Sequence, residues 1–449
     1  MSTPRTVAFH TLGCKLNYSE TSSIGKLFQQ AGYKEVAFDK PSDIYVINTC
    51  SVTDQADKKC RKIVRTAIKQ NAQAKIVVVG CYAQLKPTEI AAIPGVSIVL
   101  GAVEKFEILD YIQTVDHNSP HGFVQYSEIS EAKQFVPSYS IVGRTRSFLK
   151  IQDGCDYKCS FCTIPLARGK SRSGTIESIV MYSEGLILKD VKEIVLTGVN
   201  IGDFGNGTEV IEGIKPKKEA LFIDLIRELD KIKSECRFRI SSIEPNLCTE
   251  EIIDFVATSK HFMPHFHMPL QSGDNEILSA MRRRYKKELY QARVSHILQK
   301  MPFACIGVDV ITGFPGESDE HFSNTFRFIE DLDISYLHVF TYSERDNTSA
   351  IHLESAVPLE IRHKRSERLR NLSVKKKLKF YHKFLGSTQE ILVENKYENG
   401  CFSGFTKNYL RVLVNEDSSL INQLVKVKLT TLNKDLTYNC LVIGEQKLY

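Results

Sequence analysis

Three cysteines lie close together in the segment Asp153-Gly-Cys-Asp-Tyr-Lys-Cys-Ser-Phe-Cys162, where their spacing is CxxxCxxC. The strand-like run 148–152 comes directly before them, so the thiols occupy one short loop at the end of a strand. Three thiolates on one loop can hold three irons of a cubane cluster and leave the fourth iron without a protein ligand. The fold must therefore present this loop where a cofactor or a substrate can complete the cluster.

Two other interpretations of this loop are a zinc site and a set of buried structural thiols. Zinc knuckles normally take four ligands as two pairs, and no CxxC or CxxH partner lies near Cys155, Cys159 and Cys162 in the sequence. The ligand count and the spacing therefore favour an iron–sulfur cluster.

Residues 1–140 alternate apolar strand-like runs with helical patterns, which predicts a doubly wound α/β domain built on a parallel sheet. Three of these runs end in a cysteine: 7–13 leads to Cys14, 44–49 leads to Cys50, and 75–80 leads to Cys81. Parallel strands bring their carboxyl ends to the edge where open α/β sheets bind ligands, so we expect these thiols to converge. Ordinary buried cysteines are the alternative, but the repetition on three strands favours a second three-cysteine cluster.

The start of the chain lacks an apolar signal core, and no apolar run reaches the roughly 18 residues of a membrane span. We therefore expect a cytoplasmic protein without a membrane partner. Because that compartment keeps thiols reduced, twelve cysteines indicate metal chemistry rather than disulfides. Six cysteines fit neither cluster and are expected to be structural: Cys60, Cys236, Cys248, Cys305, Cys401 and Cys440.

From residue 141 to 375 the pattern repeats strand and helix, which predicts an incomplete barrel of six β/α units with right-handed crossovers. The strand candidates are 148–152, 193–197, 237–241, 265–268, 304–311 and 336–340. Small and polar residues gather where these strands end, which is where barrel-like α/β enzymes place their chemistry. The segments concerned are 196–200, 243–245, 267–273 and 311–317.

Residues 376–449 contain five short alternating strands, which predict a small OB-like β-barrel of a kind that often binds RNA. Its side chains that either contact RNA or form the core are Tyr397, Phe402, Phe405, Tyr409 and Arg411. The net charge of +6 is modest, but ten Lys or Arg face one acidic residue between Arg362 and Lys383. We interpret this run, and the second basic cluster at 282–287, as a solvated helix face or as a surface that follows phosphates.

The CxxxCxxC loop resembles that of the radical S-adenosylmethionine (SAM) enzymes. Three further segments resemble the methylthiotransferases of that group: Thr11-Leu-Gly-Cys-Lys-Leu-Asn17, Asn48-Thr-Cys-Ser-Val52 and Gly80-Cys-Tyr-Ala-Gln84. The resemblance covers essentially the whole chain. It implies an N-terminal methylthiotransferase domain (1–140), a radical SAM domain (141–375) and an RNA-binding TRAM domain (376–449). It also implies two 4Fe-4S clusters, an auxiliary one on Cys14, Cys50 and Cys81 and a SAM-binding one on Cys155, Cys159 and Cys162.

The resemblance further implies that SAM lies along the strand ends of the central domain. Thr197 and Gly198 would meet the methionine amino group, Glu244 and Gln271 would reach the ribose or the carboxylate, and the segment from Gly313 to Glu317 would border the adenine. Arg168, beyond the cysteine loop, would either contact the cofactor or have a structural role.

Within this family, the surroundings of Leu12 and Lys15 most resemble the branch that acts on N6-threonylcarbamoyladenosine. The resemblance implies transfer of a methylthio group to carbon 2 of this base at position 37, in the anticodon stem–loop of tRNA. The alternatives are methylthiolation of isopentenyladenosine in tRNA or of an aspartate of a ribosomal protein, and, more distantly, a non-catalytic iron–sulfur protein that binds RNA. An electron donor such as flavodoxin or ferredoxin, a monomeric state and no role on DNA are also implied.

Overall fold

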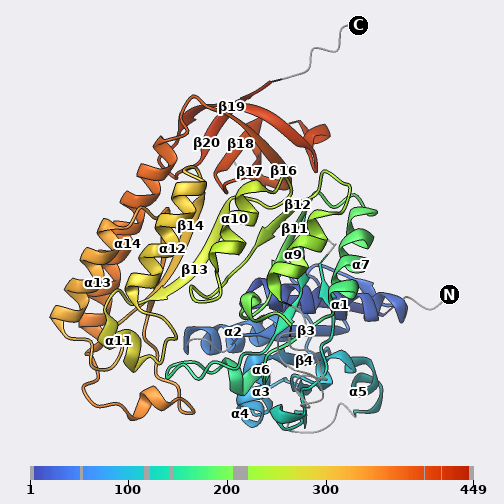
Figure 1. The fold of residues 1–449 in the computed structure, drawn as a ribbon. Helices are drawn as coiled ribbons and strands as arrows, with labels where there is room; N and C mark the ends of the chain where they lie inside the picture. Colours follow the sequence, from blue (N-terminus) through green and yellow to red (C-terminus); the bar gives the residue numbers. More distant parts are fainter. Residues whose placement is uncertain are drawn as a thin grey trace, which may run out of the picture.

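The computed structural model describes residues 5–50, 54–115, 122–140, 145–205, 221–398, 400–415 and 417–443 (Figure 1). Along the chain, a parallel sheet comes first, an open α/β barrel second and a small closed β-barrel third. Ser51 and Val52 of the second cysteine motif lie outside the described residues.

A six-stranded parallel sheet with the order β2-β1-β3-β4-β5-β6 forms the N-terminal part. Its main elements are β1 (Thr6–Thr11), α1 (Lys15–Gln30), β2 (Lys34–Glu35), β3 (Ile44–Thr49), α2 (Asp54–Gln70), β4 (Lys75–Gly80), α3 (Cys81–Leu85), α4 (Pro87–Ala91), β5 (Ile98–Leu100), α5 (Ile108–Thr114) and β6 (Phe123–Gln125). Helices α1 and α5 cover one face and α2, α3 and α4 cover the other, so the central strands are buried and mostly apolar. The predicted doubly wound sheet is confirmed.

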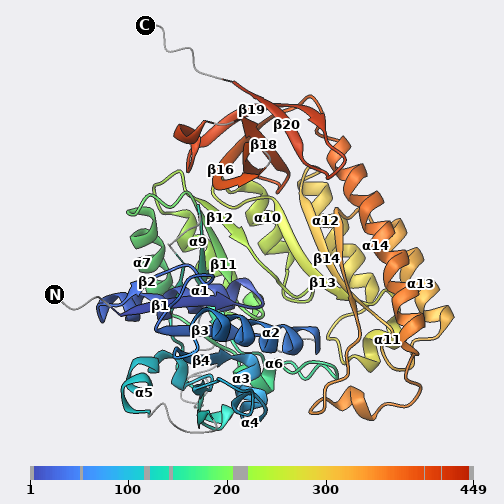
Figure 2. The same cartoon turned by 180° about the vertical axis from the view of Figure 1, so that it is seen from behind.

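Six parallel strands form the wall of the central barrel in the order β8-β11-β12-β13-β14-β15 (Figure 2). The strands are β8 (Arg146–Lys150), β11 (Glu193–Thr197), β12 (Arg237–Ile240), β13 (His265–Gln271), β14 (Cys305–Thr312) and β15 (Tyr336–Thr341), and β7 (Ser138–Tyr139) pairs antiparallel with β8. Among the described residues, β12 and β13 are joined by single bridges, and no pairing closes β15 onto β8. The wall is therefore an incomplete barrel, as predicted.

Helices cover the outside of this wall and lie between successive strands in the chain, two of them between β13 and β14. They are α7 (Ile176–Ile187), α9 (Phe222–Asp230), α10 (Glu250–Thr258), α11 (Asn275–Ala280), α12 (Lys287–Lys300) and α13 (Asp319–Asp331). Thr175, Thr249 and Ser318 precede α7, α10 and α13, and each side chain accepts a hydrogen bond from a backbone N–H of the first turn. These caps fix where the helices begin.

Five strands close into a small C-terminal barrel with the order β16-β17-β18-β20-β19. They are β16 (Thr388–Glu398), β17 (Cys401–Thr406), β18 (Arg411–Asn415), β19 (Leu424–Leu432) and β20 (Tyr438–Val442). Side chains such as Ile391, Val412 and Val427 fill its interior, and Phe402 belongs to the same core. The predicted five-stranded barrel is confirmed.

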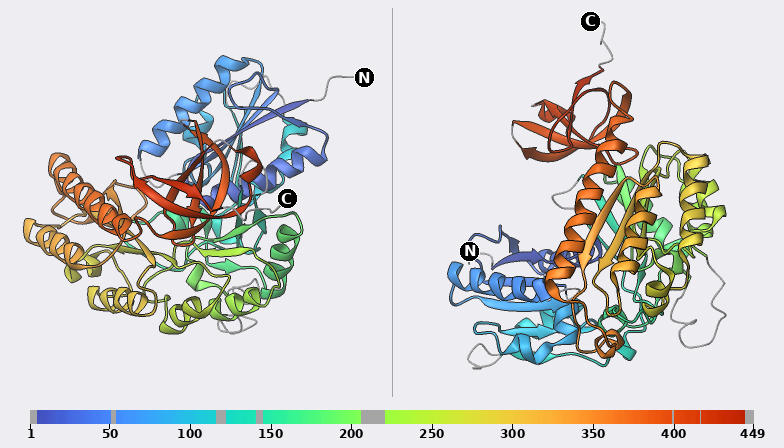
Figure 3. Two further views of the ribbon diagram at one scale, coloured as in Figure 1. Left: turned by 90° about the horizontal axis from the view of Figure 1, so that it is seen from above. Right: turned by 90° about the vertical axis from the view of Figure 1, so that its left-hand side faces the viewer.

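One long helix, α14 (Leu359–His382), packs along β15 and reaches the C-terminal barrel, where Phe380 and Tyr381 enter the barrel core (Figure 3). The expected domain boundary between residues 375 and 376 falls inside this helix. Helix α14 has 24 residues, yet it carries charged side chains along its length, and none of the described helices is long and apolar enough to cross a membrane.

The basic run on α14 has two kinds of side chain. Arg362, Arg365 and Lys376 are buried; Arg365 Nη1 lies 2.6 Å from a carboxylate oxygen of Glu317, and Lys376 donates to the carbonyl oxygen of Leu332. The exposed members are Lys364, Arg368, Arg370, Lys375, Lys379 and Lys383. Part of the run therefore holds the helix against the barrel, and only the rest forms a charged surface.

A glycine at the end of β4 shows how tightly the strand ends pack before Cys81. Gly80 has φ +101°, and a Cβ there would lie 2.4 Å from Oδ1 of Asn48 and 2.5 Å from the carbonyl oxygen of Thr49. An L side chain rarely adopts this φ, and a backbone oxygen on the neighbouring strand cannot rotate away. Only glycine fits this position.

We expect Gly80→Ala to destabilise the protein far more than Gly32→Ala. Gly32 also has a positive φ, +83°, but a Cβ there would meet nothing within 4 Å. Both variants incur the left-handed backbone penalty of about 1–2 kcal/mol, whereas only Gly80→Ala adds a collision. In thermal scans of the apo-protein at one heating rate, the midpoint shift for Gly80→Ala should be roughly twice that for Gly32→Ala or more. Equal shifts would mean that the ends of β3 and β4 are loosely packed.

Candidate active site

The loop with Cys155, Cys159 and Cys162 lies at one end of the open barrel, between β9 (Gln152–Asp153) and α6 (Ile164–Arg168). β9 pairs antiparallel with β10 (Arg172–Ser173), which follows the loop. Gly154 has φ +70°, and a Cβ there would lie 2.0 Å from the carbonyl oxygen of Lys170. The first cysteine thus follows a turn that only glycine can make.

Gln152 ties this loop to the end of the next strand. Its Nε2 donates to the carbonyl oxygen of Gly154 at 2.7 Å, and its Oε1 accepts from the backbone N–H groups of Val199 and Asn200, both at 2.9 Å. The predicted segment 196–200 is therefore held against the cysteine loop. This role of Gln152 is not visible in the sequence, because both contacts depend on the fold.

Burial raises the pKa of all three thiols. Together with neighbouring cysteines of the loop, burial raises the pKa of Cys155 and Cys162 to about 12. The three side chains therefore lie close together. Buried thiols ionise only when positive charge is supplied, and metal ions bind the ionised form. The number, burial and proximity of the donors fit an iron–sulfur cluster.

Arg283 is the cation that contacts this thiol set. Its Nη1 donates to Sγ of Cys159 at 3.1 Å, and its Nη2 forms an ion pair with Glu244. Arg283 opposes the effect of burial on the pKa of Cys159. Its side chain is only 3% exposed, and Tyr285 is buried with its hydroxyl donating to Pro269 and Leu270. The interpretation of 282–287 as a charged surface is therefore wrong for these two residues, which face inward.

The other predicted cysteines also gather at one edge, the carboxyl ends of β1, β3 and β4. Cys14 precedes α1, Cys50 follows β3, and Cys81 begins α3. A Cβ on Gly13 would lie 2.7 Å from Cβ of Cys50, so the loops of Cys14 and Cys50 are in contact. Burial raises the pKa of Cys81, and Cys14 raises it further. The structure thus brings three thiols from distant parts of the sequence together.

Asn17 connects the first thiol set (Cys155, Cys159 and Cys162) to the second thiol set (Cys14, Cys50 and Cys81). Its Nδ2 donates to the carbonyl oxygens of Leu12 at 2.8 Å and Thr49 at 3.0 Å, beside Cys14 and Cys50. Its Oδ1 accepts from Nη2 of Arg168 at 2.6 Å, and Arg168 ends the short helix that follows Cys162. A single amide therefore fixes the two loops relative to each other.

A buried charge network surrounds Arg168. Its Nη1 lies 3.0 Å from a carboxylate oxygen of Glu20 and 2.9 Å from one of Asp153. Lys105 and Lys150 also bind Glu20, at 2.9 and 3.3 Å. Burial would raise the pKa of Glu20 and Asp153, but Arg168 and the lysines lower both overall. These contacts support the structural role of Arg168, one of the two roles that the sequence leaves open.

This network leaves excess positive charge next to the second thiol set. Arg172 joins it through Asp153 at 3.1 Å, so four cations face two carboxylates. Arg168 and Lys105 both act against burial on the pKa of Cys81. An anionic group bound by Cys14, Cys50 and Cys81 would be stabilised there.

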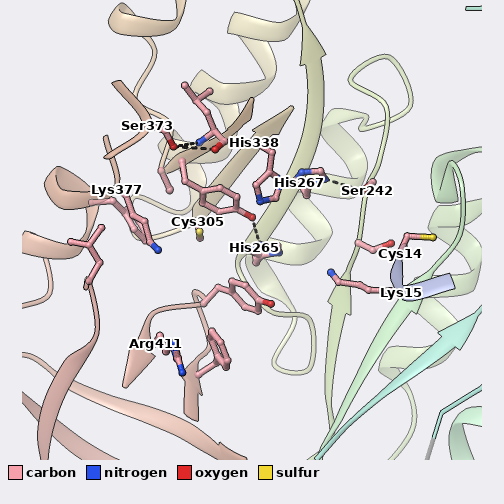
Figure 4. A pocket seen from close by; sticks show the side chains of 18 of the residues that line it. Cys14, Lys15, Ser242, His265, His267, Cys305, His338, Ser373, Lys377 and Arg411 are labelled. Atoms are coloured by element: carbon pink, nitrogen blue, oxygen red, sulfur yellow. Dashed lines mark hydrogen bonds between the residues drawn. The ribbon is translucent and has the colours of Figure 1, made fainter. Parts of the chain in front are cut away.

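A cavity of about 740 Å³ lies between the three parts of the molecule (Figure 4). Cys14 and Lys15 stand on one side of it, and Lys377 and Arg411 stand on the opposite side. Its wall also includes Thr197, Gly198, Ser241, His267, His338, Phe405 and Tyr409. The cavity therefore borders the second thiol set and is completed by the C-terminal barrel.

Asp309 separates this cavity from a smaller one beside the first thiol set. Oδ1 of Asp309 lies 3.0 Å from Nε2 of His267 and 3.1 Å from Nδ1 of His338, both on the wall of the large cavity. Asp309 itself lines a pocket of about 210 Å³ together with Cys162 and Gln271. The two cavities therefore adjoin, and each borders one thiol set.

The six residues predicted to contact SAM fall into different places. Thr197 and Gly198 line the large cavity, and Gln271, with φ +67°, lines the pocket beside Cys162. Glu244 is bound to Arg283 next to Cys159. Glu317 accepts from the backbone of Gly313 at 3.0 Å and from Arg365 of α14, and neither Glu317 nor Gly313 lines the two cavities.

Unsatisfied polar atoms mark the strand ends near these cavities. Within the described part of the chain, both amide atoms of Asn200 and the hydroxyl of Ser241 are buried without a hydrogen-bond partner. Such atoms are rare in native structures and are typical of ligand sites. The donors present therefore fit a polar ligand at the carboxyl ends of β11 and β12.

Two family models match the chain. The "Uncharacterized protein family UPF0004" model matches residues 6–101, and the "Radical SAM superfamily" model matches residues 149–329. Each matched segment contains one of the two thiol sets.

Curated relatives match nearly the whole chain. A "Threonylcarbamoyladenosine tRNA methylthiotransferase MtaB" of Bacillus subtilis (strain 168) is 40% identical over 94% of this chain and 93% of its own length. A protein with the same name from Aquifex aeolicus (strain VF5) is 36% identical over 94% of this chain and 99% of its own length.

A solved structure shares the fold. The radical S-adenosylmethionine methyltransferase TsrM from Kitasatospora setae, solved with cobalamin and a 4Fe-4S cluster, superimposes with a TM-score of 0.54 at 14% identity. The match covers 78% of this chain and 77% of that one.

Arg283→Met should weaken metal binding at Cys155, Cys159 and Cys162. The variant loses the cation that lowers the pKa of Cys159, so fewer thiolates form near neutral pH. Iron bound per chain after anaerobic reconstitution at about pH 7 should fall, and it should partly recover at about pH 9, where the thiol ionises more readily.

Arg284→Met is the matched control for this prediction. Its guanidinium lies 3.9 Å from the ring centroid of Tyr157 and is exposed, although it belongs to the same basic cluster. This variant should take up as much iron as the unaltered chain at both pH values. An equal loss in both variants would assign the effect to general positive charge and not to the contact with Cys159.

Proposed function

Because the chain belongs to the methylthiotransferase family of radical SAM enzymes, we propose that it transfers a methylthio group to carbon 2 of N6-threonylcarbamoyladenosine at position 37 of tRNA. The observation that carries the proposal is the relationship, over nearly the full length, to relatives named for this activity. The two thiol sets provide ligands for two clusters, and the adjoining cavities provide space for a cofactor and a base beside them.

Two 4Fe-4S clusters and SAM are the cofactors of this reaction. Cys155, Cys159 and Cys162 would hold the cluster that binds SAM, and Cys14, Cys50 and Cys81 would hold the auxiliary cluster. When bound, these groups supply a carbon radical from SAM together with the sulfur and the methyl group to be transferred. Of the predicted SAM contacts, Gln271 is supported by its place in the pocket with Cys162, and Thr197 and Gly198 by the unsatisfied polar atoms near them.

The chain's own residues position the base and exclude water. Phe405 and Tyr409 are stacked with ring centroids 4.7 Å apart, and both face the large cavity, so they offer an aromatic surface to a nucleobase. His267 and His338 are held by Asp309 on another part of the wall. Because the C-terminal barrel covers the cavity, a base inside it would be shielded from solvent.

The RNA would be bound mainly by the C-terminal part. We assign residues 1–140 to a methylthiotransferase domain, 141–375 to the radical SAM domain and 376–449 to a TRAM domain. The closed five-stranded barrel and the exposed lysines and arginines of α14 support this assignment, because cationic surfaces follow the phosphates of RNA. The anticodon stem–loop would approach along α14 and place base 37 in the large cavity.

The remaining partners follow from the chemistry. Reductive cleavage of SAM needs one electron, which a flavodoxin or a ferredoxin would deliver. The chain would act as a monomer in the cytoplasm, on RNA and not on DNA.

Nucleosides of tRNA from a strain without this protein test the proposal. The 2-methylthio form of N6-threonylcarbamoyladenosine should disappear, and the 2-methylthio form of isopentenyladenosine should be unchanged. The opposite result would assign the protein to isopentenyladenosine, and an unchanged profile would leave the aspartate of a ribosomal protein as the target. Mass spectrometry measures both nucleosides in one sample.

Complementation of that strain tests the two thiol sets. Replacement of Cys14, Cys50 and Cys81 together by alanine should abolish the product, because the sulfur-carrying site is lost. Cys401→Ala, in the C-terminal barrel, should restore it fully. Anaerobic incubation with SAM and dithionite should yield 5′-deoxyadenosine, and no yield from iron-loaded protein would leave a non-catalytic RNA-binding protein.

A further inference from the structure

Lys15 lines the large cavity, and none of the described carboxylates forms an ion pair with it. It is the first residue of α1, directly after Cys14, and its side chain points toward the middle of the cavity, whereas the sulfur of Cys14 points the other way (Figure 4). Within the described part of the chain, the side chain of Lys15 makes no hydrogen bond or ion pair. The charged groups that act on its ammonium group are Arg146, Arg239 and Glu193.

The charges around Lys15 are paired with each other and not with it. Arg239 binds both oxygens of Glu193, at 2.9 and 3.0 Å, and Arg146 binds Glu394 at 2.7 Å. Lys15 and the two arginines therefore face two carboxylates, and both carboxylates form ion pairs with the guanidinium groups. An unpaired ammonium in such a place is unfavourable until an anion enters the cavity.

The opposite wall is less suited to this anion. Lys377 lies 5.4 Å from the ring centroid of Tyr381, and the charge of Asp435, on the same wall, acts on it favourably. Asp435 thus partly balances Lys377, although Arg411 also lies on that wall. Among the lysines of the cavity wall, Lys15 is the one next to the second thiol set.

The chemistry of the proposed substrate matches this position. The threonylcarbamoyl group of the base carries a carboxylate, and its ureido N–H can donate to N1 of the same adenine, closing a six-membered ring. Since N1 is bonded to carbon 2, this conformation turns the threonyl group toward the carbon that receives the sulfur. A cation that follows Cys14 in the chain lies on the side where that carboxylate would arrive.

Resting on the function proposed above, we propose that Lys15 binds the threonyl carboxylate of the substrate base and so selects threonylcarbamoyladenosine over bases without a negative group. Lys15 is then a specificity residue, and its ion pair with the carboxylate forms only in the complex. Charge-assisted hydrogen bonds of this kind discriminate roughly 10- to 100-fold.

Two anticodon stem–loops of one sequence test this proposal. One carries N6-threonylcarbamoyladenosine at position 37, and the other carries the same group with the carboxylate converted to a primary amide. The ratio of kcat/KM for acid over amide, and the matching ratio of Kd from fluorescence anisotropy, are measured with the reconstituted full chain. The unaltered protein should prefer the acid roughly 10- to 100-fold.

Lys15→Met should bring both ratios to about one, because the stem–loop with the carboxylate binds and reacts less well. Lys15→Arg should retain most of the preference because it keeps the charge. Lys377→Met, which removes a lysine from the opposite wall, should keep the ratios of the unaltered protein. An undiminished preference in Lys15→Met, or a loss in Lys377→Met alone, would overturn the proposal.

Other roles of Lys15 give other results. If Lys15 contacts an RNA phosphate or the auxiliary cluster, Lys15→Met lowers binding or turnover equally for the acid and the amide, which also contradicts the proposal. Iron content identifies a variant that has lost a cluster. If the unaltered protein forms no methylthio product from either stem–loop, the proposed function fails, whereas the ratio of Kd still tests the carboxylate contact.

Discussion

The buried ion network around Arg168 is the interaction on which the relative placement of the two thiol sets depends. Glu20 and Asn17 come from helix α1 of the first sheet, whereas Arg168 and Asp153 flank the cysteine loop of the barrel. Buried charges are expensive to desolvate, and removal of one partner of such a set typically destabilises a protein by about 3–5 kcal/mol. The network therefore tolerates one arrangement of the two parts and penalises others.

The third part is attached by the same kind of contact. Arg237 binds Glu390 at 2.7 Å, and Arg239, already paired with Glu193, donates to the carbonyl oxygen of Lys407 at 3.0 Å. These bonds run from strand β12 of the open barrel to the C-terminal barrel. These bonds hold the wall with Phe405 and Tyr409 beside the cavity. Charge pairs, and not apolar packing alone, therefore orient the N-terminal sheet, the open barrel and the C-terminal barrel relative to one another.

Much of this architecture follows from local sequence. The strands of the first sheet include apolar runs such as Ile76 to Val79, a pattern typical of central parallel strands. Thr or Ser caps begin three of the barrel helices. The cysteines were also predictable, because ligand spacing on one loop and repetition at strand ends are visible without a structure.

The contacts that complete the site were not predictable, because their partners are far apart in the chain. Arg283 pairs with Glu244 over 39 residues, and Arg168 pairs with Glu20 over 148 residues. A basic residue has the same local appearance whether it faces solvent or a buried carboxylate. For this reason the sequence predicts charged surfaces at 282–287 and along the run on α14, although Arg283, Arg362 and Arg365 are internal.

The cavity wall formed by the C-terminal barrel has a consequence for biosynthesis. Phe405, Tyr409 and Arg411 leave the ribosome long after both cysteine sets, and domains generally fold in the order in which they emerge. A nascent chain can thus fold the parts that carry both thiol sets while the cavity still lacks the wall formed by the C-terminal barrel. This wall is complete only once translation has finished, so an interrupted product would leave the cavity open to the surrounding solution.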